Sequence, residues 1–420
     1  MDARPRPVVE REAPDVPDVL IAGAGPAGCA TALALRRAGV SVVLVERQAV
    51  RGETACGGSA MPRIESATPD VPVLLARLGF EGFDALAALG GAMPYECALS
   101  VHDGAPVMRR FADRGCRPGW LVDRARLDAA LRAAAIQAGA TLIDASAIDG
   151  LQRAGDRWRA SVSPVRSGTS ASTSPAAPAA SDATSLSSAS PVGVTAASPG
   201  PRSLHPRLLI DATGRRAALA AHLLGVPRHR LDRQVALQRR IPVPSAWSAA
   251  QRHSVLVEGD PAGWWSTVPG PRDIVLSWMV QAPDAADCRR PDAWGKAWSA
   301  TWSARHWLTA DAPRDETIHV TSAESACLSR AAGPGWLAIG DALMSLDPLS
   351  SSGLSGALRD AVEACDQVVL PWLSRSSGSS DPRDGWTEAQ AWATRADRFW
   401  RRFLTERASA RRSLMPMGAG

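Results

Sequence analysis

"DVLIAGAGPAGCATALALRRAGVSVVLVER", residues 18–47, is the stretch that decides the fold. Two runs rich in valine, leucine and isoleucine, "VLIAG" and "SVVLVE", flank an alanine- and leucine-rich segment that stops at Gly39. The runs are typical of short strands, and the segment between them is typical of a helix with a glycine at its C-terminal end. Two strands joined by one short helical crossover form a βαβ unit, so the sequence predicts a parallel sheet.

Three glycines between the first strand and the helix form the pattern GxGxxG. The first glycine allows a tight turn, the second lets a phosphate approach the backbone, and the third lets the helix pack close to the sheet. The helix N-terminus then offers free N–H groups to a pyrophosphate, and an acid at the end of the second strand can bind ribose hydroxyls. We therefore predict a dinucleotide site; the alternative is a glycine turn with a purely structural role. The predicted binding residues here are Gly23, Gly25, Pro26, Ala27, Gly28, Glu46 and Arg47.

The composition favours a globular protein of two or three domains, since 45% of the 420 residues are hydrophobic and 21% are charged. The net charge is only +5 and the arginines are scattered, which argues against a nucleic-acid partner and favours solvated surface arginines. The seven cysteines form no CxxC pair, which favours reduced thiols in a cytoplasmic protein over disulfides or a metal site. We expect neither a signal peptide nor a membrane span.

The chain divides by its local composition. We expect residues 1–17 to form a flexible N-terminal arm. Residues 164–206 consist largely of Ser, Ala, Pro, Thr and Gly and predict a disordered insertion, because such a segment cannot bury enough surface to offset its chain entropy. Strand candidates, "DRWRASVS" and "RLLIDATG", lie on either side, so the insertion would replace a hairpin or connecting turn.

The second half of the chain alternates apolar and polar residues in "HSVLVEG", "GWWSTVPG" and "DIVLSWMVQA". Alternation with Gly and Pro turns predicts antiparallel strands, and we expect residues 226–332 to form a β-sheet substrate domain. The nucleotide-binding domain would then be discontinuous, comprising residues 18–225 and 333–370. A C-terminal helical segment, residues 371–420, follows, with an amphipathic helix near its end.

Three further blocks, in this order, extend the pattern of residues 18–47: "WLVDRARLDAAL" (120–131), "LLIDATGRRAALA" (208–220) and "GWLAIGDALMSLDPLSSSGLSGAL" (335–358). Together the four resemble the FAD-dependent monooxygenase superfamily. The resemblance implies an α/β fold with a Rossmann-type FAD-binding domain, an antiparallel β-sheet substrate domain and C-terminal helices, the PHBH-like flavoprotein architecture.

The resemblance also implies roles for individual residues. Arg124 would lie near the flavin, and Asp341 would accept a hydrogen bond from a ribityl hydroxyl. Pro348 would start a turn over the flavin, and residues 350–353 would bring backbone N–H groups close to its ring, which only small residues allow. The plain alternative for "DPLSSSG" is an N-cap loop. The further FAD-binding residues implied are Arg124, Asp341, Pro348, Ser352, Gly353 and Leu354.

Two segments point to a branch of the superfamily. "RGETACGGSAMP" (51–62) and "VEGDPAGWWSTVPGPRDIVLSWMVQA" (257–282) resemble tryptophan-halogenase-like flavoproteins, and the nearest resemblance is to the QhpG and LodB type of cysteine tryptophylquinone biogenesis. We predict that Trp264 and Trp265 wall the substrate pocket, with strand alternation turning one of them toward the core; the alternative is ordinary core packing. The catalytic residue is unknown, with Glu53, Ser350 and Ser351 as candidates, and no metal is expected.

The activity implied is hydroxylation of an electron-rich aromatic ring through a flavin C4a-hydroperoxide, with a tryptophan side chain of a peptide or protein among the substrates considered. Electrons would come from NAD(P)H directly or through a separate flavin reductase, and the absence of a "DG" motif in the region of "DATGRRA" favours the latter. A flavin halogenase is disfavoured because the single lysine, Lys296, lies far downstream of the "GE" segment. Two further functions stay open, a flavin reductase or dehydrogenase and a non-catalytic flavin-binding assembly factor.

Overall fold

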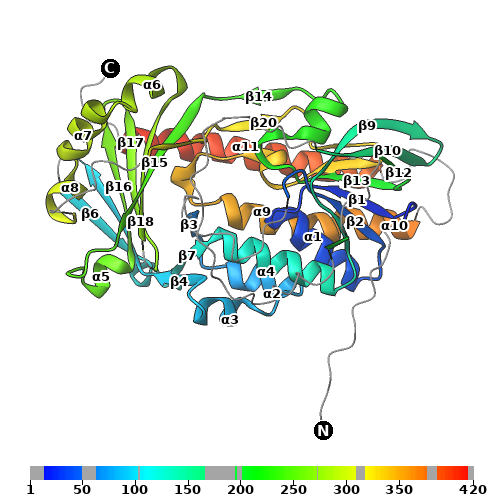
Figure 1. The fold of residues 1–420 in the computed structure, drawn as a ribbon, viewed down its shortest axis with the longest axis horizontal. Helices are drawn as coiled ribbons and strands as arrows, with labels where there is room; N and C mark the ends of the chain where they lie inside the picture. Colours follow the sequence, from blue (N-terminus) through cyan, green and yellow to red (C-terminus); the bar gives the residue numbers. More distant parts are fainter. Residues whose placement is uncertain are drawn as a thin grey trace, which may run out of the picture.

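The computed structural model describes residues 14–49, 63–102, 105–165, 194–195, 201–271, 273–308, 317–375 and 386–414. Two seven-stranded sheets lie toward opposite ends of an elongated molecule, and helices pack between and around them (Figure 1). The first sheet is mainly parallel and the second mainly antiparallel, which confirms the predicted fold class.

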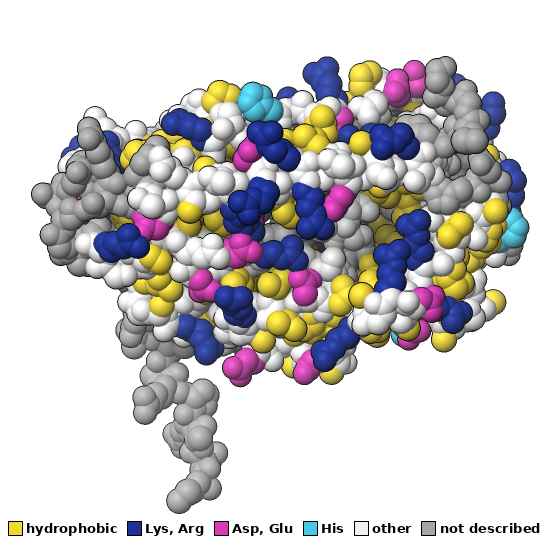
Figure 2. All heavy atoms as spheres, turned by 180° about the vertical axis from the view of Figure 1, so that it is seen from behind, with side chains coloured by type: hydrophobic (Ala, Val, Ile, Leu, Met, Phe, Trp, Pro, Cys, Tyr) yellow, Lys and Arg dark blue, Asp and Glu magenta, His cyan; other side chains and the backbone are white. Residues whose placement is uncertain are grey.

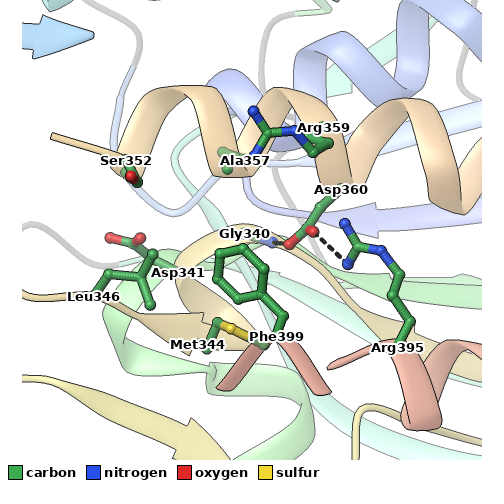
Figure 3. Close-up of a pocket in the computed structure, with 12 residues that line it drawn as sticks. Gly340, Asp341, Met344, Leu346, Ser352, Ala357, Arg359, Asp360, Arg395 and Phe399 are labelled. Atoms are coloured by element: carbon green, nitrogen blue, oxygen red, sulfur yellow. Dashed lines mark hydrogen bonds and ion pairs between the residues drawn. The ribbon is translucent and has the colours of Figure 1, made fainter. Parts of the chain in front are cut away.

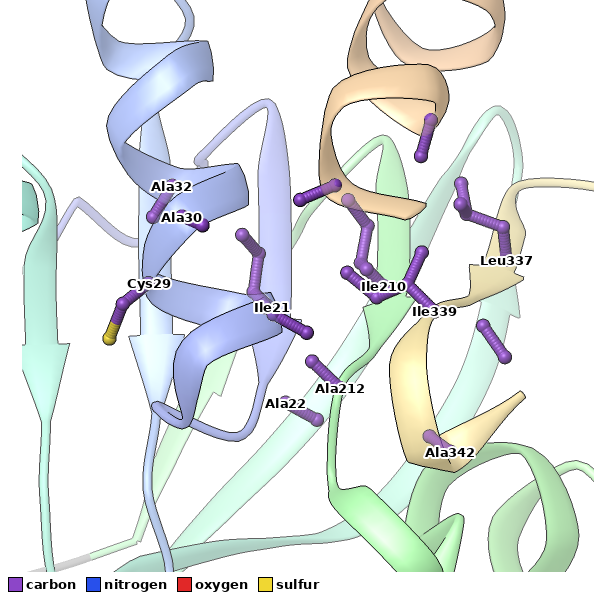
Figure 4. Packing of buried hydrophobic residues seen from close by; sticks show 14 of the residues in the cluster. Ile21, Ala22, Cys29, Ala30, Ala32, Ile210, Ala212, Leu337, Ile339 and Ala342 are labelled. Carbon is purple, nitrogen blue, oxygen red and sulfur yellow. The ribbon is translucent and has the colours of Figure 1, made fainter. Parts of the chain in front are cut away.

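The first sheet has the strand order β11-β8-β2-β1-β13-β22-β21. The predicted βαβ unit is present, because β1 and β2 pair in parallel and α1 connects them. Its central strands are wholly buried, as parallel strands covered on both faces must be, and Ile21, Ile210 and Leu337 pack side by side there (Figure 4). The elements are β1 (Val19–Ala22), α1 (Pro26–Arg37), β2 (Val42–Val45), β8 (Thr141–Ile143), β11 (Val194–Thr195), β13 (Leu208–Asp211), β21 (Ala332–Gly333) and β22 (Trp336–Ala338).

The second sheet has the strand order β19-β15-β18-β17-β16-β5-β6. The three predicted strands of residues 254–281 are β16, β17 and β18, and they pair antiparallel as expected. Strands β5 and β6 come from residues 97–110, so this sheet also draws on the first half of the chain. The elements are β5 (Cys97–His102), β6 (Ala105–Arg110), β15 (Gln234–Pro242), β16 (Ser254–Asp260), β17 (Gly263–Pro269), β18 (Asp273–Gln281) and β19 (His319–Ser322).

Smaller elements fill the space around the two sheets. Three three-stranded sheets have the orders β12-β10-β9, β14-β20-β23 and β3-β7-β4. Their strands are β3 (Ile64–Ala67), β4 (Ala92–Tyr95), β7 (Gly119–Asp123), β9 (Ser146–Ala154), β10 (Arg157–Pro164), β12 (Arg202–Leu204), β14 (Arg228–Arg230), β20 (Ala326–Leu328) and β23 (Met344–Ser345). The helices are α2 (Val71–Arg77), α3 (Phe83–Ala88), α4 (Arg124–Gln137), α5 (Ala249–Arg252), α6 (Ala285–Cys288), α7 (Pro291–Ala300), α8 (Trp302–His306), α9 (Gly353–Ala364), α10 (Leu370–Arg375) and α11 (Trp386–Leu414).

The segment predicted as an insertion is structured at its C-terminal end. Residues 202–204 form β12, which pairs antiparallel with β10, and Leu204 is fully buried. The predicted insertion is therefore shorter at this end, because an apolar side chain in the "PRSLHP" stretch reaches the core. Most of the serine- and alanine-rich segment, the first 13 residues and the segment 50–62, which contains Glu53, lie outside the described residues.

The described surface carries charges of both signs. Figure 2 shows arginine side chains interspersed with Asp and Glu on one face, without one continuous basic stripe. Among the described residues, no helix is long and apolar enough to cross a membrane, and no group of three His, Cys, Asp or Glu is arranged to hold a metal ion. The six cysteines in this part of the chain are all free, and only Cys116 is exposed.

Candidate functional site

The predicted cofactor residues follow the ends of three parallel strands of the first sheet, the neighbours β2 and β1 and, one strand further on, β22. Gly23 comes directly after β1, Glu46 after β2, and Asp341 shortly after β22. Because the carboxyl ends of parallel strands meet at one edge of the sheet, residues from three distant parts of the chain come together there. This edge is where open α/β sheets bind their ligands.

The three glycines of the β1–α1 turn have different surroundings. Gly23 has a φ of +99°, and a Cβ there would lie 2.3 Å from the carbonyl oxygen of Ala212, which follows β13. A Cβ on Gly28 would lie 2.0 Å from the carbonyl oxygen of Gly23, so α1 can approach the turn only with a glycine at this position. A Cβ on Gly25 would meet nothing within 4 Å. The first and third glycines thus serve packing, and the second faces open space at the N-terminus of α1, where a pyrophosphate would lie.

Glu46 is tied to the glycine turn. Its carboxylate accepts hydrogen bonds from the backbone N–H of Ala24 at 2.8 Å and of Gln48 at 2.9 Å. These bonds fix the acid beside the turn, and a carboxylate oxygen can accept more than one bond. Arg47, the next residue, is exposed.

Charged side chains of both signs surround Asp341. Burial raises the pKa of its carboxyl, while Arg215, whose Nε lies 3.5 Å from Oδ2 of Asp341, opposes that shift. Glu65 and Arg124 also act on this pKa, which shows that the predicted flavin residues Arg124 and Asp341 come within electrostatic range of each other. About a third of the Asp341 side chain remains accessible, and it faces a hollow also lined by Ser352 (Figure 3).

Arg124 itself is engaged by protein carboxylates. Its Nη1 donates to Glu65 at 2.7 Å and its Nε to Asp128 at 3.0 Å. Although burial alone would lower the pKa of Arg124, these two acids raise it above its usual range. Burial raises the pKa of Glu65, but Arg124 and Arg63 outweigh that effect and hold it below its usual range. Arg124 is therefore a fixed cation with its donors largely committed to the protein.

The loop of residues 347–353 is held in a tight, locally bonded turn. Asp347 accepts a hydrogen bond from the N–H of Leu349 at 3.2 Å, and its carbonyl accepts from the hydroxyl of Ser350 at 2.9 Å. Ser351 adopts a left-handed conformation with a φ of +49°, and its Oγ lies 2.8 Å from Oγ of Ser66 on β3. The turn leads directly into α9, whose first N–H groups have no partner within the helix and can face a ligand.

The two adjacent tryptophans of β17 point to opposite faces of the second sheet. Trp264 packs with Met279 and Ala323 and against Leu349 of the loop just described. Trp265 is fully buried on the other face, stacked on Trp278 at 4.9 Å between ring centroids and covered by helix α7. Strand alternation thus leaves only Trp264 on the side of the candidate site, and Trp265 packs in the core.

The arrangement fits a flavin dinucleotide. Gly25, Gly353 and Gly356 each have open space where a side chain would be, so the backbone of the glycine turn and of α9 can be approached closely. Gly340, with a φ of +58°, lets the turn before Asp341 pack between Ala27 and Ala357. The N-terminus of α1 and that of α9 therefore open toward the same edge of the sheet as Asp341.

Sequence reasoning missed several residues of this site. Arg215, Arg228, Glu65 and Ser66 approach the segment around Asp341 and Ser351 only through the tertiary fold. Arg228 donates to the carbonyl of Asp341 at 3.1 Å, so two arginines face this turn. The "DATGRRA" stretch was the only available signal for Arg215. Glu53 lies outside the described residues, so its catalytic candidacy stays a prediction.

Comparison with known proteins agrees with this geometry. Residues 18–114 match the family described as FAD dependent oxidoreductase. No curated protein sequence matches the chain significantly.

Several solved structures share the fold over most of the chain. The flavin-dependent brominase Bmp2 is 18% identical with a TM-score of 0.66, over 90% of this chain and 84% of that chain. The peptidyl tryptophan dihydroxylase QhpG, described as essential for tryptophylquinone cofactor biogenesis, is 22% identical with a TM-score of 0.60, over 92% and 74%. PqsL of Pseudomonas aeruginosa, described as a probable FAD-dependent monooxygenase, is 16% identical with a TM-score of 0.66, over 91% and 93%. At these identities the likeness establishes the fold.

Proposed function

We propose that this FAD-dependent oxidoreductase is a monooxygenase that hydroxylates an electron-rich aromatic ring, and that a tryptophan side chain of a peptide or protein belongs to its substrate class. Reduced FAD, when bound, supplies the activation of dioxygen. The residues in the chain that would hold FAD are those of the β1–α1 turn, Glu46, Asp341 and the start of α9. QhpG, which shares this fold, acts on a peptidyl tryptophan, and that printed activity supports the choice of substrate class.

One observation carries the proposal. The face of the second sheet that bears Trp264 abuts the loop at Leu349, just before the N-terminus of α9. An aromatic substrate between sheet and loop could stack on apolar side chains and indoles, which suits an electron-rich ring. The buried face of the sheet around Trp264 and Met279 would also keep water from the reacting atoms.

The position of Lys296 separates this proposal from a halogenase function. Lys296 is exposed on α7, and α7 covers the Trp265 face of the sheet rather than the Trp264 face. As the single lysine of the chain, it cannot serve a reaction at the Leu349 side without a large rearrangement. The fold shared with the brominase Bmp2 is therefore no reason to assign a lysine-dependent halogenation to this chain.

The electron donor is part of the proposal. We favour a separate flavin reductase over direct use of NAD(P)H, because the region of "DATGRRA" lacks the "DG" motif linked to direct nicotinamide use. Turnover with NADPH alone, compared with turnover after addition of a flavin reductase, distinguishes the two routes.

The decisive experiment is a mass measurement on the acceptor. The purified protein, reduced FAD and air would be incubated with a tryptophan-containing peptide and, separately, with free tryptophan. A mass gain of 16 or 32 supports hydroxylation, as expected from insertion of one or two oxygen atoms. A gain of chlorine or bromine in halide buffer, or of two hydrogens, would contradict it in favour of halogenation or reduction. Lys296→Ala serves as control and should leave the hydroxylation rate unchanged.

A further inference from the structure

The C-terminal helix α11 reaches the segment 340–353 at two points, through Asp360 at Gly340, where the segment begins, and directly at Asp347, in its middle. Helix α11 runs along the long axis of the molecule between the two large sheets and contacts β21, β5 and β16 (Figure 1). The sequence indicates only an amphipathic helix packed on the core. Its charged residues make contacts that packing alone does not require.

The first point lies at the turn that precedes Asp341. The N–H of Gly340 donates to Oδ2 of Asp360 at 2.9 Å, and Oδ1 of Asp360 accepts from Nη1 of Arg395 on α11 at 2.9 Å (Figure 3). Arg395 also pairs with Glu363 and lies over the ring of Trp392, 4.6 Å from its centroid. Asp360 therefore links α11 to the Gly340 turn through hydrogen bonds on both of its carboxylate oxygens.

The tryptophan beneath Arg395 adds a bond to the same region. The Nε1 of Trp392 donates to the carbonyl of Ala338, the last residue of β22, at 3.1 Å. Phe399, further along α11, lines the hollow that also contains Asp341 (Figure 3). The first half of α11 thus contacts the strand, the turn and the hollow in succession.

The second point lies at Asp347, which is only 1% exposed. Its carboxylate accepts from Nε of Arg407 at 2.9 Å and from Nε of Arg411 at 2.8 Å. Arg407 also pairs with Asp232, and Arg411 with the side chain of Gln234. Two cations and two anions thus form a nearly buried, neutral cluster between α11, the loop and the start of β15.

Asp347 is the first residue of the turn that brings the chain to the flavin side. The same carboxylate that meets the two arginines caps the N–H of Leu349, and the backbone carbonyl of Asp347 accepts from Ser350. If Asp347 moved, both local hydrogen bonds would break, and Ser351 would no longer be held in its left-handed conformation. Breaking one side of a buried charge cluster is strongly unfavourable, so the cluster holds Asp347 firmly.

We propose that Arg395, Arg407 and Arg411 of α11 are positioning residues for FAD, which hold the flavin-facing segment 340–353 at its first residue, Gly340, and at its middle, Asp347. These three arginines would act through Asp360 and Asp347 and would not contact the cofactor themselves. The inference rests on FAD binding but not on which reaction the flavin performs. A substitution on α11, on the side of the loop away from the flavin, should therefore alter the environment of bound flavin.

The test compares two double variants of the full-length protein that remove equal charge from the same helix. Arg407→Gln/Arg411→Gln breaks the cluster at Asp347. The matched control is Arg401→Gln/Arg402→Gln, whose side chains are each 76% exposed and, within the described part of the chain, form ion pairs with Asp397 and Glu406 of α11 alone. Exposed pairs of this kind contribute little to stability.

Three quantities would be measured for each: the dissociation constant for FAD, the visible absorption spectrum of bound flavin, and its midpoint potential. We expect the test variant to bind FAD on the order of tenfold more weakly, since partial loss of a buried cluster easily reaches that size. Its spectrum should change and its potential become more negative, because misplaced N–H groups no longer stabilise reduced flavin. The control should match the wild type in all three.

A test variant that melts at a lower temperature but keeps the wild-type FAD affinity, spectrum and potential would overturn the inference, because α11 would then only support the fold. Should the double variant fail to fold, Arg407→Lys keeps the charge but cannot reach Asp232 and Asp347 together, and it should show a smaller change in the same direction. Wild-type protein that takes up no FAD would defeat both this inference and the proposed function. Wild type that binds FAD but hydroxylates nothing would defeat only the latter.

Discussion

The guanidinium of Arg215 lies 3.5 Å from the carboxylate of Asp341, although 126 residues separate them in the sequence. Arg215 follows β13 and Asp341 follows β22, two adjacent parallel strands, so the pair forms at the carboxyl edge of the sheet. Burial nevertheless raises the pKa of Asp341, so Arg215 and the other arginines nearby do not fully offset the loss of water around the carboxylate. An acid kept at such a position is typical of a binding role.

Asp341→Asn should separate stability from FAD binding. Because the pKa of Asp341 is raised in the folded state, folded protein holds this proton to higher pH than unfolded protein does. Below the unfolded-state pKa of about 4, Asp341 is protonated in both states and does not change the free energy of unfolding. As the pH rises through the folded-state pKa, the buried carboxyl must ionise, and the free energy of unfolding falls. The FAD-free variant should melt a few degrees above wild type at pH 7, and the difference should vanish near pH 4.

The same variant should bind FAD on the order of tenfold more weakly, since a charged acceptor is lost. Thermal unfolding from pH 4 to pH 7 and FAD titration give the two readouts. Equal melting temperatures at all pH values would contradict the account of Asp341.

Gly25→Val should abolish FAD binding without unfolding the protein. A side chain at this position meets no protein atom within 4 Å, and its φ of −79° suits any residue. The added methyl groups would instead occupy the space where we expect the pyrophosphate of FAD. Far-ultraviolet circular dichroism should be unchanged and the yellow colour lost; retention of stoichiometric FAD would show that the pyrophosphate lies elsewhere.

Gly28→Ala is the matched variant with the opposite outcome. Its Cβ would lie 2.0 Å from the carbonyl oxygen of Gly23, so α1 must move away from the turn. Overpacking of this kind costs about 1–3 kcal/mol, and we expect a lower melting temperature even without FAD. A variant as stable as wild type would refute the packing role of the third glycine.

The two tryptophans of β17 should respond differently to substitution. Trp265→Ala removes a fully buried ring stacked on Trp278 and should cost about 3–5 kcal/mol of unfolding free energy. Trp264→Phe keeps an aromatic ring and removes an indole N–H that has no partner in the described part of the chain, so stability should change little. Its KM for the aromatic substrate should instead rise several-fold. Denaturant unfolding and steady-state kinetics check the pair; an unchanged KM would remove Trp264 from the substrate site.

Deletion of residues 168–192, joined by a short Gly-Ser turn, should leave the fold and the FAD content nearly intact. The deletion spares β10, β11 and β12, and loop-closure entropy depends only weakly on loop length. A melting temperature within a few degrees of wild type is expected. Loss of soluble protein or of flavin would show that this serine- and alanine-rich segment does more than connect strands.

Local patterns were sufficient to predict the βαβ unit and its glycine turn. The predicted roles of Gly23, Gly25 and Gly28 depend on a strand, a turn and a helix adjacent in the chain, so their spacing carries the information. The alternation in residues 254–281 likewise predicted β16, β17 and β18, because side-chain direction in a strand follows sequence parity. The same rule anticipated that Trp264 and Trp265 face opposite sides.

The tertiary structure alone decided which distant residues meet. No spacing indicates that Arg215 approaches Asp341, that Ser66 meets Ser351, or that Arg407 reaches Asp347, because these pairs are separated by 60 to 285 residues and depend on how whole elements pack. The sequence also placed β5 and β6 with the nucleotide-binding half, whereas pairing with β16 puts them in the second sheet. Sequence by itself thus determined the elements and the glycine turn for which we predict dinucleotide binding. The charges around the segment 340–353 follow from long-range packing, which a local pattern does not encode.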